Sequence, residues 1–162
     1  MMSTDPAWLH AARLHMGLKE IPGPRHNTTI QRWLRDLHAW WSDDETPWCG
    51  TFVAHCMQVA GVATPSAFYR AKAWASFGQE LKFDRLAPGA ILVFDRQGGG
   101  HVGFYVGEND KSFYVLGGNQ SNGVNIVPIL KERCIAARWP RNSAILGHPV
   151  RMTGGKVSTN EA

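Results

Sequence analysis

The amino-acid sequence predicts an α+β fold, in which N-terminal helices pack on a C-terminal antiparallel β-sheet. In the first half of the chain, apolar residues recur at helical spacing between Pro- and Gly-rich loops. In the second half, short β-rich runs are separated by Gly, Asn and Asp turns. Helices followed by a meander of strands are typical of the α+β class. The length of 162 residues suits one domain with a hydrophobic core.

The first helix is expected at residues 6–16, with Asp5 as the cap, Pro6 at the first helical position and Gly17 as the stop. A second helix is expected over "TTIQRWLRDLHAWW", residues 28–41, because its apolar residues follow helical spacing. The third helix opens at the cap-and-proline pair Thr46-Pro47 and ends at Gly61. A short fourth helix is expected over "SAFYRAKAWASFG".

Five β-rich runs follow, and we expect them to form one antiparallel meander. They are "LAPGAILVFDR", "HVGFYVGE", "KSFYVLGG", "GVNIVPIL" and "RCIAARW". Residues 1–140 are therefore expected to form a single catalytic domain. Residues 141–162 contain a Gly pair and many polar side chains, and we expect a partly flexible C-terminal extension there.

Composition and charge exclude several classes of protein. The chain is 44% hydrophobic and 19% charged, as in ordinary globular proteins, and no apolar run reaches the roughly 20 residues of a membrane-spanning helix. The N-terminus lacks the charged start, apolar stretch and cleavage site of a secretory signal. The net charge of +4 suits anionic partners such as nucleic acid, membrane surfaces or bacterial cell wall. Because the basic residues are scattered, nucleic-acid binding is not indicated.

The three cysteines do not have the spacing of a disulfide framework or a zinc ribbon. Cys56 lies on the apolar face of the third helix, where a cysteine behaves as a small buried hydrophobe. Cys49 lies in the first turn of that helix, two residues after Pro47. Backbone N–H groups and the helix dipole favour a thiolate at this position, so we expect Cys49 to be a nucleophile.

A nucleophilic cysteine needs a base, and His101 is the candidate. It follows "QGGG" and opens the strand "HVGFYVGE", on which Gly103 shares its face and is expected to leave space for a helix end. His55 is nearly two turns from Cys49 on the same helix and cannot easily turn back to the sulfur. A helix N-terminus that delivers Cys49 to His101 would give the geometry of nucleophilic cysteine catalysis.

A third group is expected to fix the tautomer of the imidazole. The next strand ends in "YVLGGNQSNG", and Asn119 is the expected orienting residue, with Gln120 as the alternative. The oxyanion would be held by the backbone N–H of Cys49 and one further donor that the sequence does not identify.

Four segments together resemble the CHAP and NlpC-type papain-like superfamily, and most closely a phage- and prophage-associated group within it. They are "KEIPGPRHN", "DDETPWCGTFV", "GHVGFYVG" and "LGGNQSNGVNI", and the resemblance covers most of the chain up to about residue 140. It implies a papain-like fold and a cysteine hydrolase of peptidoglycan, with Cys49 as nucleophile, His101 as base and Asn119 as the third member. Many relatives have a glutamate where this chain has Asn119.

The same resemblance guides the expectations about substrate, cofactor and partners. Trp48, Trp74 and Gln120 are expected to bind substrate, and Trp41 is a further candidate for the cleft. No cofactor and no metal are expected, because Asp43, Asp44 and Glu45 lack the alternating pattern of a calcium site. The partner is peptidoglycan, without nucleic acid or stable membrane insertion, and the protein is expected to be a monomer.

The biological role stays open at this point. A lone catalytic domain made in the host cytoplasm and acting in the periplasm fits a phage endolysin released by a holin. It also fits an antibacterial toxin neutralised by an immunity protein, or a tail lysin. A related cysteine acyltransferase and a non-catalytic module of the same fold are the alternatives from other functional classes.

Overall fold

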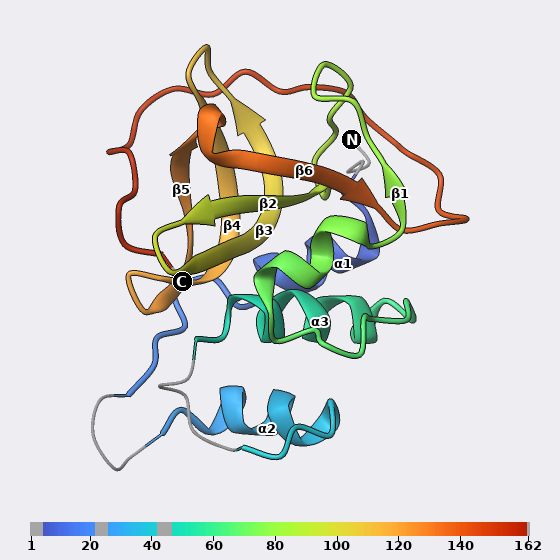
Figure 1. The fold of residues 1–162 in the computed structure, drawn as a ribbon, viewed down its shortest axis with the longest axis vertical. Coiled ribbons are helices and arrows are strands. Elements are labelled where there is room, and N and C mark those ends of the chain that lie inside the picture. Colours follow the sequence, from blue (N-terminus) through green and yellow to red (C-terminus); the bar gives the residue numbers. More distant parts are fainter. Residues whose placement is uncertain (1–4, 22–25, 42–46, 162) are drawn as a thin grey trace.

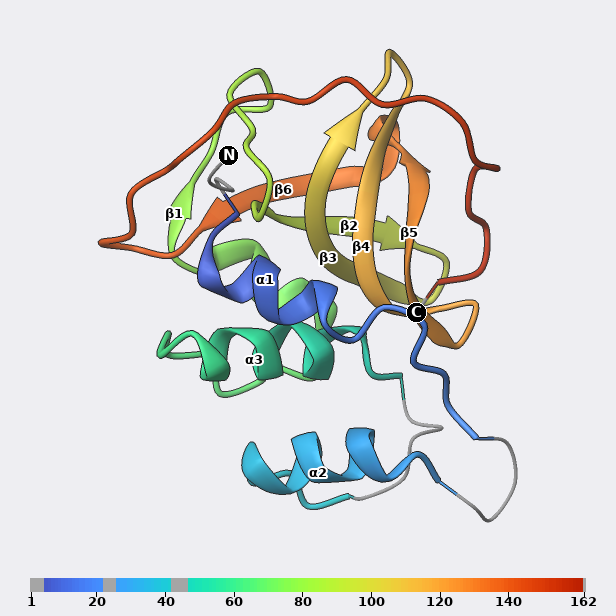
Figure 2. The same cartoon turned by 180° about the vertical axis from the view of Figure 1, so that it is seen from behind.

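The structure is a computed structural model that describes residues 5–21, 26–41 and 47–161. Its elements form layers, which are visible in Figures 1 and 2. The helix α3 (Cys49–Val59) lies between the β-sheet and the helix α2 (Thr28–Asp36). The helix α1 (Ala7–Arg13) lies beside α3 on the same side of the sheet. This arrangement of helices on an antiparallel sheet confirms the predicted α+β, papain-like fold class.

The sheet has six strands in the order β1-β6-β2-β3-β4-β5, and every paired neighbour is antiparallel. The strands are β1 (Gln79–Glu80), β2 (Ile91–Arg96), β3 (Gly99–Glu108), β4 (Ser112–Gln120), β5 (Gly123–Leu130) and β6 (Cys134–Trp139). The five predicted runs correspond to β2–β6, whereas the short edge strand β1 was not predicted. A short 3-10 helix, η2 (Lys131–Arg133), leads from β5 into β6.

The helices are shorter than their sequence patterns predicted. The N-cap of α1 is Pro6 rather than Asp5, and α1 ends in a turn that reaches Gly17, which has a φ of +92°. The helix α2 begins after Asn27, whose side chain accepts hydrogen bonds from the N–H groups of residues 29 and 30. It ends early because His38 adopts a left-handed conformation, with a φ of +61°.

Two further helix predictions have different outcomes. Thr46, the expected cap of the third helix, lies outside the described residues, and α3 begins at Cys49. The expected fourth helix is reduced to a 3-10 helix, η1 (Ala71–Ser76), preceded by turns. The carbonyl of Phe68 accepts a hydrogen bond from the Trp74 indole at 2.9 Å. This bond ties the turns to η1 without an α-helix.

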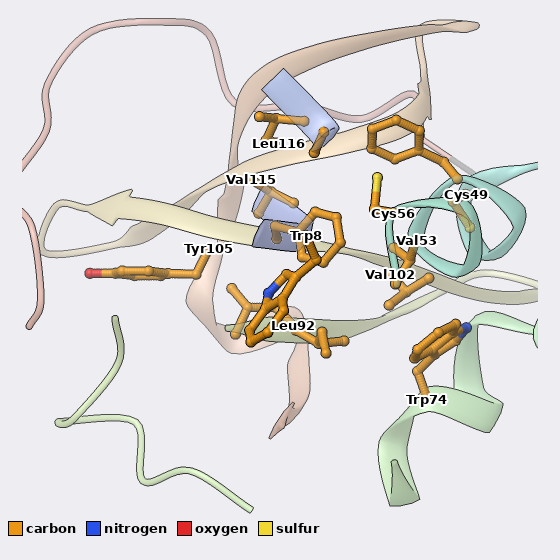
Figure 3. Packing of buried hydrophobic residues seen from close by; sticks show 14 of the residues in the cluster. Trp8, Cys49, Val53, Cys56, Trp74, Leu92, Val102, Tyr105, Val115 and Leu116 are labelled. Carbon is orange, nitrogen blue, oxygen red and sulfur yellow. The ribbon is translucent and has the colours of Figure 1, made fainter. Parts of the chain in front are cut away.

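The hydrophobic core lies between α3 and the sheet. The rings of Phe52 on α3 and Phe104 on β3 are 6.4 Å apart and edge-on, and both side chains are fully buried. Figure 3 shows Val53 and Cys56 on α3 and Trp74 on η1 among the buried hydrophobic side chains. Within the described part of the chain, no helix is long and apolar enough to span a membrane.

The segment after residue 140 lacks regular secondary structure but contacts the sheet at several points. The N–H of Val150 donates to the Tyr105 hydroxyl at 3.1 Å. The Tyr114 hydroxyl donates to the carbonyl of Gly154 at 2.5 Å. Near the end of the chain, the buried carboxylate of Glu161 pairs with Arg133. The boundary at residue 140 and the partial flexibility of the extension remain predictions.

A histidine pair connects α3 to α1. The Nε2 atoms of His15 and His55 are 3.2 Å apart, and the His55 ring stacks on Trp33 of α2 with centroids 4.7 Å apart. The Nδ1 of His55 is buried and has no hydrogen-bond partner among the described residues. Burial, with a smaller contribution from His15, lowers the pKa of His55 from 6.5 to about 4, although Asp36 acts in the opposite direction.

We predict that acid destabilises the fold through this pair. The pKa of His55 is lower in the folded protein, so the unfolded chain takes up the proton first. The stabilising contribution is therefore present above pH 6.5 and is lost as the pH falls toward 4. The His55→Phe variant keeps the stacking on Trp33 and should reduce the decrease in unfolding free energy between these pH values, measured by urea denaturation. The exposed His10 provides the control, and an unchanged pH dependence in His55→Phe would refute the prediction.

Candidate active site

Cys49 is the first residue of α3, and the residue before it fixes its position. Trp48 is the N-cap residue, and its carbonyl accepts the N–H of Phe52 at 2.9 Å. Its indole N–H donates to the carboxylate of Glu20 at 3.0 Å. The Trp48 side chain itself makes no capping hydrogen bond to the helix. The Cys49 thiol is thus placed at a helix N-terminus, as the sequence predicted, where the backbone N–H groups favour an anion.

Two glycines allow close packing around this helix end. A Cβ atom at Gly118 of β4 would lie 2.7 Å from the Cβ of Phe52 and 2.8 Å from the Trp48 ring. A Cβ atom at Gly50 would clash with the carbonyl oxygen of Phe68. Because neither glycine has a side chain, the start of α3 sits directly between β4 and the 68–69 backbone.

Cys49 lines a cavity of about 370 Å³. The cavity extends to the first residues of β3, which are the two residues before His101. Its lining consists of Pro47, Cys49, Tyr69, Arg70, Ala71, Lys72, Arg96, Gly99 and Gly100. A larger cavity of about 730 Å³ lies elsewhere, between residues 80–85 and 145–149, and contains no cysteine. The smaller cavity is therefore the candidate active site.

His101 is fully buried and forms a hydrogen bond with Gln120. The Nε2 of the imidazole lies 3.0 Å from the Oε1 of Gln120. The Gln120 amide nitrogen donates to the carbonyl of Asn125 at 2.8 Å and lies 3.0 Å from its side-chain oxygen. The Asn125 amide donates back to the carbonyl of Gln120 at 2.8 Å. These contacts hold the Gln120 side chain in one orientation.

The orientation of Gln120 determines the tautomer of a neutral His101. The amide nitrogen is directed to the oxygens of Asn125, so Oε1 faces the imidazole. An amide oxygen only accepts hydrogen bonds, and Nε2 must therefore carry the proton. In the neutral ring, Nδ1 then has the lone pair that can accept a proton.

In the structure, the side chain that contacts the His101 imidazole is that of Gln120, the alternative to Asn119; which of the two acts as the orienting residue stays a prediction. Gln120 is fully buried and meets the imidazole, whereas Asn119 adopts a left-handed conformation with a φ of +59°. The β4–β5 pairing is irregular between Gly117 and Gln120, so simple alternation along β4 does not predict which side chain reaches His101. Gln120 is buried beside the imidazole, and its expected role in substrate binding stays a prediction.

The predicted role of Gly103 is wrong. A Cβ atom at this position would clash with the side chain of Val115 on β4, so this residue accommodates a neighbouring strand rather than a helix end. The side chain of β3 that meets α3 is Phe104. By strand alternation, His101 projects from the opposite face of β3, where its ring lies 6.4 Å from that of Phe94.

The structure brings Cys49 close to the start of β3 but not into hydrogen-bonding contact with His101. Gly99 and Gly100 line the Cys49 cavity, and His101 is the next residue along the strand. Among the described residues, the Cys49 thiol and the His101 imidazole form no hydrogen bond with each other.

The two expected substrate-binding tryptophans are core residues. Trp48 is 1% exposed and Trp74 is 0% exposed, and each indole N–H has an internal acceptor. The Trp41 ring, in contrast, is partly buried and lies edge-on to Tyr69, with centroids 5.1 Å apart. Tyr69 lines the Cys49 cavity, so an aromatic surface leads to it from Trp41.

The other two thiols are in different environments. Cys56 is fully buried and burial raises its pKa, while burial raises the pKa of Cys134 to about 12. In the described part of the chain, no three His, Cys, Asp or Glu side chains come together as a metal site. Asp43, Asp44 and Glu45 lie outside the described residues.

Sequence reasoning missed two parts of the site. Asn125 was not selected, although it follows Gln120 by five residues across a two-residue turn, where two strand partners are expected to meet. Arg70 and Lys72 lie at the start of η1 and Arg96 lies at the end of β2, so the cavity that they share is a property of the fold.

We predict that Gln120 controls the proton position on His101. In the unaltered protein, the neutral His101 imidazole should be the Nε2–H tautomer. The Gln120→Leu variant should lose this preference. Imidazole ¹⁵N chemical shifts measure the tautomer directly. Asn119→Gly is the matched control, since glycine tolerates the left-handed conformation. A tautomer shift in the control but not in Gln120→Leu would restore Asn119 as the orienting residue.

Comparison with known proteins finds one family model that matches part of the chain. Residues 41–119, a little under half of the chain, match the family model of the CHAP domain. The matched region includes Cys49 and His101 and ends one residue before Gln120. No curated protein sequence matches the chain. CHAP domains are in general cysteine- and histidine-dependent hydrolases of peptidoglycan, and the match supports placing this chain in the CHAP superfamily.

Proposed function

We propose that the protein hydrolyses an amide bond in the peptide part of peptidoglycan, with Cys49 as nucleophile, His101 as base and Gln120 as positioning residue. The observation that carries the proposal is the hydrogen bond between His101 Nε2 and Gln120 Oε1. Because this bond keeps the proton on Nε2, the lone pair of Nδ1 can act as the base that takes the thiol proton. The position of Cys49 at the start of α3 also supports the proposal. The cavity that Cys49 lines extends to Gly100, the residue before His101. The CHAP match supports the substrate class.

The chemistry would follow from these positions. His101 Nδ1 takes the thiol proton, and the thiolate attacks the scissile carbonyl carbon. The resulting oxyanion is stabilised by the unpaired N–H groups at the start of α3, including that of Cys49. The imidazolium then gives its proton to the leaving amine, and a thioester forms on Cys49. Water activated by the neutral imidazole hydrolyses the thioester and restores the thiol.

The mechanism requires the thiol and the imidazole to approach each other during catalysis. Catalytic hydrogen bonds often form only in the substrate complex. The approach would take place at Gly99 and Gly100, where the strand presents no side chain between the cavity and His101.

We further propose the biological role of a phage endolysin that acts on the cell wall in the periplasm as a monomer. The resemblance of four sequence segments to phage- and prophage-associated enzymes supports this role, and the net charge of +4 suits an anionic wall. Neighbouring holin and spanin genes would support it, whereas a neighbouring immunity gene would favour the antibacterial toxin. The bond cut is either within the stem peptide or between muramic acid and L-alanine.

The Cys49→Ala variant should release no new amines from purified sacculi, because the thioester cannot form without the sulfur. The unaltered protein should release them steadily, and the Cys134→Ala variant, which removes a thiol outside the cavity, should behave like the unaltered protein. Mass spectrometry of the digest separates an endopeptidase from an amidase by the fragments left. Equal rates for Cys49→Ala and the unaltered protein would exclude the proposed nucleophile.

The Gln120→Leu variant should lower kcat on the order of 10- to 100-fold, because the imidazole loses the acceptor that orients it. KM should change little, since Gln120 is buried and does not contact substrate. Asn119→Gly should keep most of the activity. The assignment would be contradicted if Gln120→Leu raised KM without lowering kcat. It would also be contradicted if Asn119→Gly lowered kcat more than Gln120→Leu.

A further inference from the structure

The Cys49 cavity has a strongly cationic lining. Arg70, Lys72 and Arg96 line it, and the lining contains no acidic residue in the described part of the chain. Clustered cations around a nucleophile raise the local concentration of anionic ligands and position them. We propose that Arg70 and Arg96 bind a carboxylate of the substrate peptide next to the scissile bond. This inference rests on the proposed hydrolysis of peptidoglycan at Cys49.

Lys72 contributes less than the two arginines. Its ammonium pairs with the carboxylate of Asp95 at 2.8 Å, and both side chains are more than half exposed. This pair is largely neutral toward a ligand, so among the described lining residues the positive charge comes from Arg70 and Arg96.

Arg96 is pre-organised at the strand end. It is partly buried, and its Nε donates to the carbonyl of Gly100 at 3.2 Å. Its Nη2 lies 3.6 Å from the position that a Cβ atom on Gly99 would occupy. Since glycine lacks that atom, the guanidinium head lies against open backbone beside the cavity. A guanidinium fixed in this way can bind a carboxylate through two parallel hydrogen bonds.

Arg70 also lines the cavity and directly follows the 68–69 backbone that packs against Gly50. Its guanidinium carbon is 6.0 Å from the centroid of the Tyr69 ring. Within the described residues, Arg70 has no carboxylate partner. A cation that is oriented by an aromatic ring and not neutralised by a carboxylate is suited to an anionic ligand.

The chemistry of the proposed substrate supplies such a ligand. In peptidoglycan stem peptides a glutamate is linked through its side chain, so its α-carboxylate is free and lies beside an amide bond of the backbone. Some cell walls carry this group as a carboxamide instead. The two forms have almost the same shape but differ by one negative charge. A carboxylate site formed by Arg70 and Arg96 would therefore distinguish them.

The test compares two synthetic muramyl stem peptides that differ only in a carboxylate or carboxamide at this glutamate. The unaltered protein should hydrolyse the carboxylate form with a kcat/KM roughly 10- to 100-fold higher, as expected for a charge-assisted bidentate pair. In the Arg70→Gln/Arg96→Gln double variant this ratio should fall to near 1. The Arg85→Gln variant removes the same charge from a different cavity and should keep the ratio. An unchanged ratio in the double variant would overturn the proposal.

Binding to the Cys49→Ala variant separates this inference from the proposed function. Isothermal titration should show tighter binding of the carboxylate peptide, and the added arginine substitutions should abolish the difference. In one outcome, the protein cleaves neither peptide while its tighter binding of the carboxylate peptide depends on the arginines. That result would support the carboxylate site and refute the proposed reaction. If the two peptides bind equally or not at all, the carboxylate site is refuted, whatever the activity.

Discussion

The close packing of the α3 N-terminus against β4 is the constraint on which the candidate site depends. Trp48 and Phe52 approach the strand within a distance that only glycine permits at position 118. On the other side of the helix end, Gly50 permits the same closeness to the 68–69 backbone. The thiol-bearing residue lies between these two contacts. A larger residue at position 50 would clash with backbone, and one at position 118 would clash with the buried side chains of Trp48 and Phe52, so either would displace the helix end.

A second constraint is the hydrogen-bonded network around Gln120. The turn at residues 121 and 122 has two positive φ angles, +50° and +62°, which suit a two-residue hairpin. This turn sets the pairing of Gln120 with Gly123 and brings Asn125 to the Gln120 amide. Buried polar groups are costly unless they are satisfied, so the network fixes one arrangement of the imidazole. The two constraints act on different members of the site, and both involve the end of β4.

Much of the fold could be predicted from the sequence because its signals are local. The proline and helical spacing before and after Cys49 predicted the helix that starts there, and alternation with glycine turns predicted five strands. The third site residue could not be predicted in the same way. Asn119 and Gln120 are neighbours, and the irregular pairing at this point, which depends on β5, decides which one meets His101.

The roles of the tryptophans and of Gly103 also could not be predicted from local sequence patterns. Trp48 and Trp74 are residues of a type that often lines binding clefts, but both are buried under other parts of the chain. The small size of Gly103 was correctly recognised as significant, yet the group that fills the space is Val115 rather than the helix. Such assignments depend on which face of a strand meets which neighbour, and that is determined by tertiary packing.

The unequal environments of the three thiols have a practical consequence. Burial keeps Cys56 and Cys134 protonated in the neutral range, whereas Cys49 opens onto a cavity. In a Cys134→Ala variant, which removes the partly buried second thiol, electrophilic warheads, fluorogenic tags and crosslinkers directed at sulfur should therefore attach at Cys49. The stoichiometry of such labelling would count functional molecules in a preparation.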